Sequence, residues 1–156
     1  MPVEIKGNRR TRDRRTNNSD IKRMSATGLG LFDEQNRFLL VLLKELKYAQ
    51  ESKRSVDFIL GMMSCLEQSI LHQFGFQEEL MQKSNYSDRE KHIEAHREFI
   101  LQYFTQTKQK LSKNQPVDFD EIIVWFATHI YHKDKTMSKH LKERLAEVRR
   151  NETEQQ

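Results

Sequence analysis

Histidine and carboxylate side chains fall on helix faces that the surrounding pattern of apolar residues predicts to be buried. His92 and His96 are four residues apart, so both imidazoles leave one face of a helix, about 5–6 Å apart. Two imidazole nitrogens at this spacing can share one metal ion. Glu78 and His129 take the corresponding inward positions on two other predicted helices. Because burying these groups without partners would be costly, the pattern favours a metal site inside a helical protein.

Four long helices are predicted to position these side chains, because apolar residues recur at spacings of three and four along the chain. They run from about 31 to 50, 55 to 83, 87 to 111 and 118 to 148. The predicted inward positions are Phe32, Asn36, Leu39, Leu43 and Leu46 in the first helix, Leu71, Phe74, Glu78 and Met81 in the second, and His92, His96, Phe99 and Tyr103 in the third. Ser87 and Glu90 have the spacing of a capping box, and Asp118 is the expected N-cap of the fourth helix. Short polar connections then predict an all-α fold, an up-down-up-down antiparallel four-helix bundle.

The composition agrees with this architecture and excludes several classes of protein. The chain of 156 residues suits one domain, and only two prolines and five glycines argue against a loop-rich β-sandwich. One cysteine, Cys65, leaves no internal disulfide and no CxxC zinc site. No apolar run reaches the roughly 18 residues of a membrane span, and no secretion signal follows Met1. We therefore expect a cytoplasmic protein. No Ser/His/Asp arrangement or Gly-rich phosphate loop indicates an enzyme.

Three motifs follow one another along the second, third and fourth predicted helices. They are Phe74-Gly-Phe-Gln-Glu78-Glu79-Leu-Met81, His92-Ile-Glu-Ala-His96-Arg-Glu-Phe99 and Trp125-Phe-Ala-Thr-His129-Ile130-Tyr-His-Lys-Asp134. Together with the opening Phe32-Asp33-Glu34-Gln35-Asn36, they resemble the bacterial hemerythrins over about residues 29–141. The resemblance implies a four-helix bundle that holds non-haem iron and binds O₂. It also implies metal ligands at His92, His96 and His129 and carboxylate ligands at Glu78 and Asp134.

Two ligand positions of that family carry other residues in this chain. Asn36 and Phe74 stand where the family has histidines, and both missing ligands belong to the same iron. Neither side chain replaces a neutral imidazole as a strong ligand. We therefore predict one iron per chain, or no metal, in place of a diiron pair. Such a site would bind or sense O₂, NO or another redox species.

The participation of Asp134 makes a prediction about the backbone. Asp134 is five residues after His129, which is about 140° around a straight α-helix, so its carboxylate would point away from the bundle axis. A π-type turn between the two residues would bring it back toward the axis. We therefore expect a wide turn in this part of the fourth helix.

Basic residues are concentrated before the bundle. Residues 1–28 contain eight Lys or Arg and three acidic residues, whereas the remainder contains 19 basic and 20 acidic ones. This segment has no apolar periodicity and is expected to be a flexible arm, followed by the bundle at 29–149 and a polar tail at 150–156. Its candidate contact residues for nucleic acid, an acidic partner or a nucleotide are Arg9, Arg10, Arg14 and Arg15. A weaker similarity, to the cyclic-di-GMP motif of the PilZ family, is carried by Arg10, Arg14 and the run Ser25-Ala-Thr-Gly28. Arginine side chains are suited to binding the phosphates of such a nucleotide.

Three functional hypotheses follow. The first is a hemerythrin-like metal-binding protein that senses or binds a small ligand. The second is a regulatory or interaction module that keeps the bundle, lacks diiron chemistry and acts through its basic arm. The third is an enzyme, a mononuclear-iron oxidase or a peroxide-consuming activity. The sequence leaves the metal, the ligand, the partner and the oligomeric state open.

Overall fold

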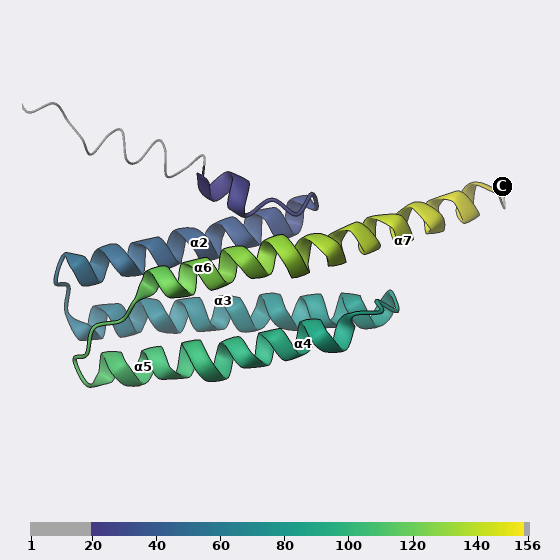
Figure 1. Ribbon diagram of the computed structural model, residues 1–156. Helices are drawn as coiled ribbons and strands as arrows, with labels where there is room; N and C mark the ends of the chain where they lie inside the picture. Colours follow the sequence, from purple (N-terminus) through teal and green to yellow (C-terminus); the bar gives the residue numbers. More distant parts are fainter. Residues whose placement is uncertain (1–19, 155–156) are drawn as a thin grey trace, which may run out of the picture.

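The computed structural model describes residues 20–154, and these residues form an all-α helical bundle, as predicted. Its long helices are α2 (Gly30–Glu51), α3 (Val56–Lys83), α4 (Arg89–Glu98), α5 (Thr105–Ser112), α6 (Phe119–His129) and α7 (Lys135–Glu154). Two π-helical segments, η1 (Phe99–Phe104) and η2 (Ile130–Asp134), join α4 to α5 and α6 to α7. Figure 1 shows α2, α3, the continuous run from α4 to α5 and the continuous run from α6 to α7 lying side by side. The chain reverses its direction at each connection between these runs.

The starts of two helices show one correct and one wrong prediction. Asp118 caps α6, because its side chain accepts hydrogen bonds from two backbone N–H groups of the first turn. The predicted capping box of Ser87 and Glu90 does not form, since the N-cap of α4 is Asp88 and makes no side-chain cap. The carboxylate of Glu90 instead accepts a hydrogen bond of 2.6 Å from Arg89. A local ion pair therefore replaces the box.

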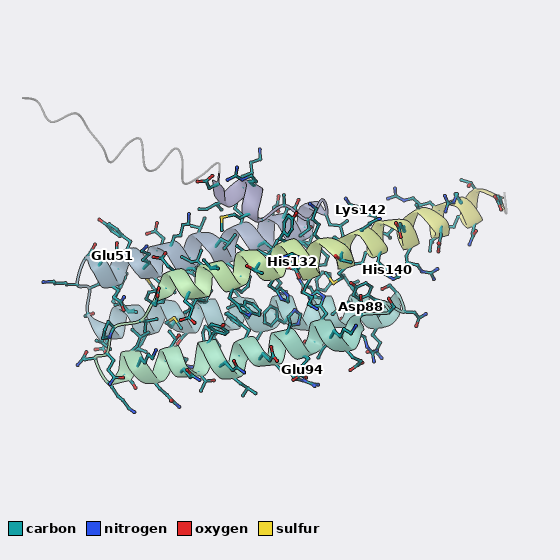
Figure 2. All side chains as sticks on the ribbon, in the orientation of Figure 1. Glu51, Asp88, Glu94, His132, His140 and Lys142 are labelled. Atoms are coloured by element: carbon teal, nitrogen blue, oxygen red, sulfur yellow. The ribbon has the colours of Figure 1, made fainter. Side chains whose placement is uncertain are left out.

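The buried interior has two apolar parts. The larger part lies toward the end of the bundle that carries Glu51, and the smaller part lies toward the end that carries Asp88 (Figure 2). The smaller part contains Phe32, Met81, Tyr86, Met137 and Leu141. Buried polar residues lie between the two apolar parts, and α2, α3, the α4–α5 run and the α6–α7 run each contribute at least one of them. They are Asn36, Gln73, Gln77, His92, His96, His129, Asp134 and Ser138. We call this set the polar layer.

The inward face of α2 matches the prediction, because all five predicted positions are buried. On α3, Phe74 and Met81 are buried as predicted, whereas the other two predicted positions are not fully buried. Leu71 is 51% exposed and Glu78 is only half-buried, whereas Gln73 and Gln77 are 2% and 0% exposed. The second predicted stripe is therefore wrong at Leu71, because the bundle buries a face that carries both glutamines.

The π-helical segment η1 was not predicted, and it changes which aromatic residue enters the core. Phe99 and Phe104 are both buried, although five residues separate them, and Tyr103 is only half-buried. On a straight α-helix five residues would turn the side chain about 140° away. The wider π turn restores the common face, as shown by the backbone N–H of Thr105, which donates to the Ile100 carbonyl five residues earlier.

The ends of the described chain extend the bundle beyond the predicted limits. Ile21 is 4% exposed and belongs to the larger apolar part, and Thr27 donates two hydrogen bonds to Asp33 at the start of α2. Residues 20–28 thus pack on the bundle, although the arm was expected to reach residue 28. The arginine candidates Arg9, Arg10, Arg14 and Arg15 lie outside the described residues.

At the other end of the described chain, α7 continues to Glu154, beyond the predicted helix end at 148, and projects past the other helices (Figure 1). Within residues 20–154, no helix combines the length and the apolar content needed to cross a membrane.

Candidate metal centre

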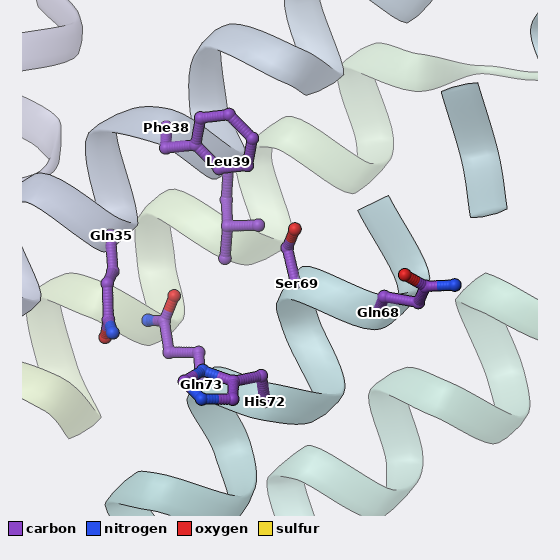
Figure 3. A pocket seen from close by; sticks show the side chains of 7 residues that line it. All are labelled: Gln35, Phe38, Leu39, Gln68, Ser69, His72 and Gln73. Atoms are coloured by element: carbon purple, nitrogen blue, oxygen red, sulfur yellow. The ribbon is translucent and has the colours of Figure 1, made fainter. Parts of the chain in front are cut away.

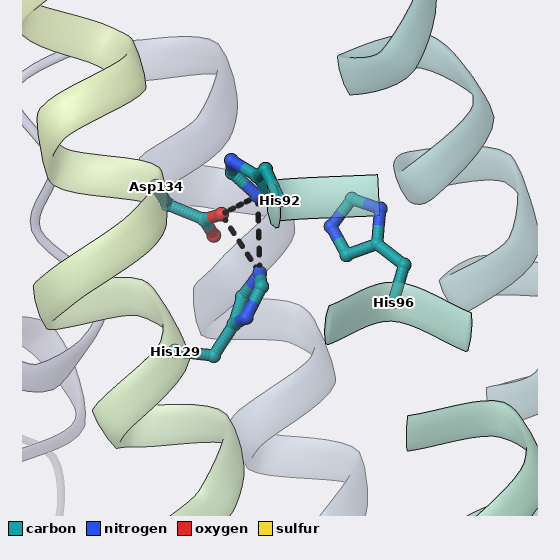
Figure 4. Close-up of side chains that lie close together, drawn as sticks. All are labelled: His92, His96, His129 and Asp134. Carbon is teal, nitrogen blue, oxygen red and sulfur yellow. Dashed lines mark hydrogen bonds and ion pairs between the residues drawn. The ribbon is translucent and has the colours of Figure 1, made fainter. Parts of the chain in front are cut away.

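Three histidines and one aspartate meet in the polar layer (Figure 4). His92 and His96 come from α4, His129 is the last residue of α6 and Asp134 is the last residue of η2. All four are buried, with exposures between 1% and 5%. Each offers one ligand atom, and these four atoms lie within 4.8 Å of one another. Four potential ligands from three helical segments therefore converge at one point.

Three of the ligand atoms form a nearly equilateral triangle. His92 Nε2 lies 3.2 Å from His129 Nε2, and Asp134 Oδ1 lies 3.2 Å from each of them. Ligand atoms about 2.0–2.2 Å from one transition metal ion are separated from each other by roughly 3.0–3.5 Å. The triangle therefore fits a common ion. The close approach of two imidazole nitrogens is also explained by such an ion.

The wide turn predicted between His129 and Asp134 is present. The π-helical segment η2 begins directly after His129 and ends at Asp134. Its wider turn brings the fifth residue back to the face that carries the histidine. As a result Asp134 is 1% exposed and contacts His129 directly. The local backbone geometry thus builds the aspartate into the cluster.

Glu78 lies beside this cluster and holds one of its histidines. His96 Nδ1 lies 3.1 Å from Glu78 Oε1, and a carboxylate can only accept, so Nδ1–H donates. This hydrogen bond leaves His96 Nε2 unprotonated, and Nε2 has no hydrogen-bond partner within residues 20–154. A histidine that donates through one nitrogen to a carboxylate and presents the other is the usual form of a metal ligand. Glu78 therefore orients His96, and the four ligand atoms that lie within 4.8 Å of one another do not include one from Glu78.

The charge states of the buried groups are those that bind metals. Burial lowers the pKa of His96 to about 2, and the adjacent His129 and His92 act in the same direction. Burial also lowers the pKa of His92, although its hydrogen bond with Asp134 opposes this shift. For Asp134, burial raises the pKa, but hydrogen bonds from His129 and His92 outweigh it and the pKa falls below its ordinary value. The cluster thus combines the neutral imidazoles of His92 and His96 with an ionised carboxylate.

Aromatic rings fix the orientation of two of the imidazoles. The ring of Phe74 stacks on that of His96, with centroids 3.7 Å apart and planes inclined by 4°. The indole of Trp125 stacks on His129, with centroids 4.8 Å apart and planes inclined by 13°. Phe99 packs behind Trp125 at 4.3 Å. Since packed rings restrict rotation of the imidazoles, the ligand nitrogens are held in place before any ion binds.

The remaining side of the polar layer carries amides that the sequence analysis missed. Asn36 is fully buried, as predicted, and its Oδ1 accepts a hydrogen bond from Gln73. Gln77 lies one turn after Gln73 on α3 and is fully buried. The pair Gln73 and Gln77 has the same spacing of four as Phe74 and Glu78, shifted by one residue. Ser138 on α7 completes this side. This second pair of residues at a spacing of four was the sequence signal that could have identified the buried glutamines.

A surface pocket of about 680 Å³ adjoins the metal-binding side of the layer. His129 and Trp125 form part of its wall, together with His132 and Lys133 from η2. His129 lines the pocket and also belongs to the triangle of ligand atoms, so its side chain is shared by the pocket wall and the cluster. Small molecules in solution can therefore come within one side chain of the cluster.

Comparisons of this chain with protein-family models, curated proteins and solved structures found no match. The resemblance to hemerythrins accordingly depends on the motifs and not on a matched relative. The buried His/Asp cluster is established by its geometry, whatever family the chain belongs to.

Proposed function

We propose that this protein binds one transition metal ion at His92, His96, His129 and Asp134 and uses it to bind a small redox-active molecule. The observation that carries the proposal is the 3.2 Å triangle of His92 Nε2, His129 Nε2 and Asp134 Oδ1. Without an ion, the layer would keep an unpartnered His96 nitrogen and two crowded imidazoles in its interior. One ion would coordinate all four groups.

Iron is the metal that we propose. Three imidazoles and one carboxylate suit iron and also zinc, so the donor set alone does not choose between them. The motifs that resemble hemerythrins favour iron, and an iron centre would supply the capacity to bind O₂ or NO. The pocket beside His129 and Trp125 gives such a molecule a path to the centre.

One ion per chain is proposed because only one side of the polar layer has strong ligands. On the other side, Asn36 and Gln73 hydrogen-bond to each other and Gln77 is neutral. Neutral amides are weak ligands for iron compared with imidazole and carboxylate. Reversible O₂ carriage by two bridged irons is therefore not part of the proposed function.

The test is metal analysis of the untagged protein after expression with iron or with zinc in the medium. We expect about one iron per chain, no absorption bands of an oxo-bridged pair, and an electron paramagnetic resonance signal when NO is added to the iron(II) form. Two irons with such bands would contradict the single site. Zinc bound in preference to iron would contradict the redox role, and no bound metal would contradict the proposal as a whole.

A further inference from the structure

The amide side of the polar layer contains buried polar atoms that no protein group satisfies. Within residues 20–154, the atoms without a hydrogen-bond partner on this side are Gln35 Oε1, Asn36 Nδ2, Gln73 Oε1, both polar atoms of Gln77, and Ser138 Oγ. Asn36, Gln77 and Ser138 are fully buried, and Gln73 is 2% exposed. Native proteins rarely leave buried polar atoms unpaired, because each one loses its hydrogen bonds to water. A concentration of them therefore indicates a bound molecule.

Two of these residues are joined directly, and the others are buried in the same polar layer. The hydrogen bond between Gln73 and Asn36 joins α3 to α2. Gln77 follows Gln73 by one helical turn on the same buried face, and Ser138 lies one turn after Asp134 on α7. Phe74, which is adjacent to Gln73 in sequence, packs its ring on His96 of the metal-binding side. The amides and Ser138 thus form an uncharged part of the polar layer.

The amide part of the layer meets a pocket at the surface. A pocket of about 420 Å³ lies between α2 and α3, and Gln35 and Gln73 both line it (Figure 3). The same wall includes the exposed His72 and Gln68. Gln73 therefore contacts the pocket and also hydrogen-bonds to the buried Asn36. The lining of this pocket includes none of His92, His96 and His129.

The chemistry of the unpaired atoms selects the kind of molecule. Amide and hydroxyl groups offer both donors and acceptors, and no formally charged side chain belongs to the group. A cation would need carboxylates or imidazoles, and an anion would need a basic side chain or several aligned donors. A neutral molecule that both donates and accepts hydrogen bonds satisfies the group without an uncompensated charge.

We propose that Asn36, Gln73, Gln77 and Ser138 form a binding subsite for small uncharged molecules that donate and accept hydrogen bonds, entered through the pocket between α2 and α3. Water and hydrogen peroxide share this chemistry, and the experiment separates them. The subsite does not depend on metal binding, because none of its residues belongs to the His/Asp cluster.

The first measurement detects resident water in the full-length, metal-free protein. We expect the side-chain amide protons of Asn36 and Gln77 to show magnetisation exchange with long-lived water in nuclear magnetic resonance spectra. The absence of such exchange, together with no response to peroxide, would overturn the proposal, because the amides would then be a dry core.

The second measurement adds hydrogen peroxide to the same metal-free protein. Saturable shifts of the Asn36 and Gln77 amide resonances would identify peroxide as a ligand, whereas resident water without such shifts would identify the subsite as one for water alone. Both results support the subsite. Sodium azide serves as the anionic probe, and saturable shifts of the same resonances by azide would overturn the assignment to uncharged molecules.

The variant test compares two glutamines of the same helix. Gln77→Leu removes two of the polar atoms, so we expect the exchange with long-lived water at Asn36 to disappear and any peroxide affinity to fall about tenfold. Gln82→Leu changes an exposed residue of α3 that does not line the pocket and should change neither. Equal signals in Gln77→Leu and the parent protein would overturn the proposal. If Gln77→Leu does not fold, the two measurements on the parent protein still decide it.

Discussion

The two sides of the polar layer are equally buried but have opposite chemistry. The histidine side joins α4, α6 and η2, and its residues are 1–5% exposed. The amide side joins α2, α3 and α7, and its residues are 0–2% exposed. On the histidine side, ligand atoms approach one another to 3.2 Å around a common point. On the amide side, Asn36 and Gln73 satisfy each other in part and the remaining atoms are neutral.

This comparison shows that burial alone does not decide what a polar cluster can hold. A metal ion requires donors with negative or strongly basic character that converge, and only the histidine side has them. A neutral cluster of amides suits an uncharged molecule. The two neighbours Phe74 and Gln73 belong to different sides, because the Phe74 ring lies flat against His96 while Gln73 hydrogen-bonds to Asn36.

The largest expected effect comes from removing a ligand on the histidine side. His129→Ala deletes one corner of the triangle and should lower metal affinity by more than about 100-fold, because loss of a direct ligand exceeds the 10–100-fold effect of losing an outer partner. Metal per chain, measured after dialysis against a weak chelator, checks this. His72→Ala is the control, since His72 is exposed on α3. A loss of metal in the control that equals the loss in His129→Ala would show that the ion binds elsewhere.

Strong ligands introduced on the amide side should remove the difference in metal binding between the two sides. We expect the triple variant Asn36→His, Gln73→His, Gln77→Glu to bind a second ion, raising the metal content from about one to about two per chain. These positions are all buried, and the changes at 73 and 77 keep the side chain close to its original size. Metal analysis and circular dichroism of the folded variant give the measurement.

The control for this experiment follows the register that the sequence predicted. The double variant Asn36→His, Phe74→His places the second histidine where the ring packs on His96, so we expect it to retain about one ion per chain. A second ion in the double variant and not in the triple variant would reverse our assignment of the α3 face.

Much of the bundle and most of the candidate metal site could be predicted from the sequence. The i, i+4 pair of His92 and His96 was sufficient for one shared face. The π turn between His129 and Asp134 was predicted from their spacing together with the ligand role that the resemblance to hemerythrins implies for Asp134. Both features depend on one helix at a time, so the sequence of that helix was sufficient to predict them.

Features that depend on the rotation of a helix against its neighbours were predicted less well. In α3, glutamines occupy 73 and 77, and Phe74 and Glu78 form a second pair with the same spacing, so periodicity alone did not choose the buried pair. Packing against α2 buries Gln73 and Gln77 and leaves Glu78 half-exposed. The segment η1 was missed because aromatic residues occupy both 103 and 104. Contacts between helices resolved both ambiguities.

A smaller effect is expected from the carboxylate that orients His96. Glu78→Ala removes the acceptor for His96 Nδ1–H, and such changes typically lower metal affinity about 10–100-fold. Burial raises the pKa of Glu78, so Glu78→Gln, which keeps an acceptor oxygen without the charge, should lose less affinity. Competitive metal titration measures the series. Glu79→Ala, which changes an exposed residue paired with Lys83, should leave the affinity unchanged. Identical affinities in Glu78→Ala and Glu79→Ala would show that the contact does not orient the ligand.

The smallest expected effect concerns the ring that stacks on His96. Phe74→Leu keeps an apolar side chain but removes the stacked contact with His96, so the metal-free protein should lose about 1–2 kcal/mol of unfolding free energy. Because His96 then gains rotational freedom, metal affinity should also fall by a few-fold, which makes the loss of stability larger in the metal-loaded protein. Denaturant unfolding of both forms measures the two losses. Equal losses would mean that Phe74 fills the core without positioning His96. A loss confined to the metal-free protein would mean that the ion, once bound, holds His96 without help from the ring.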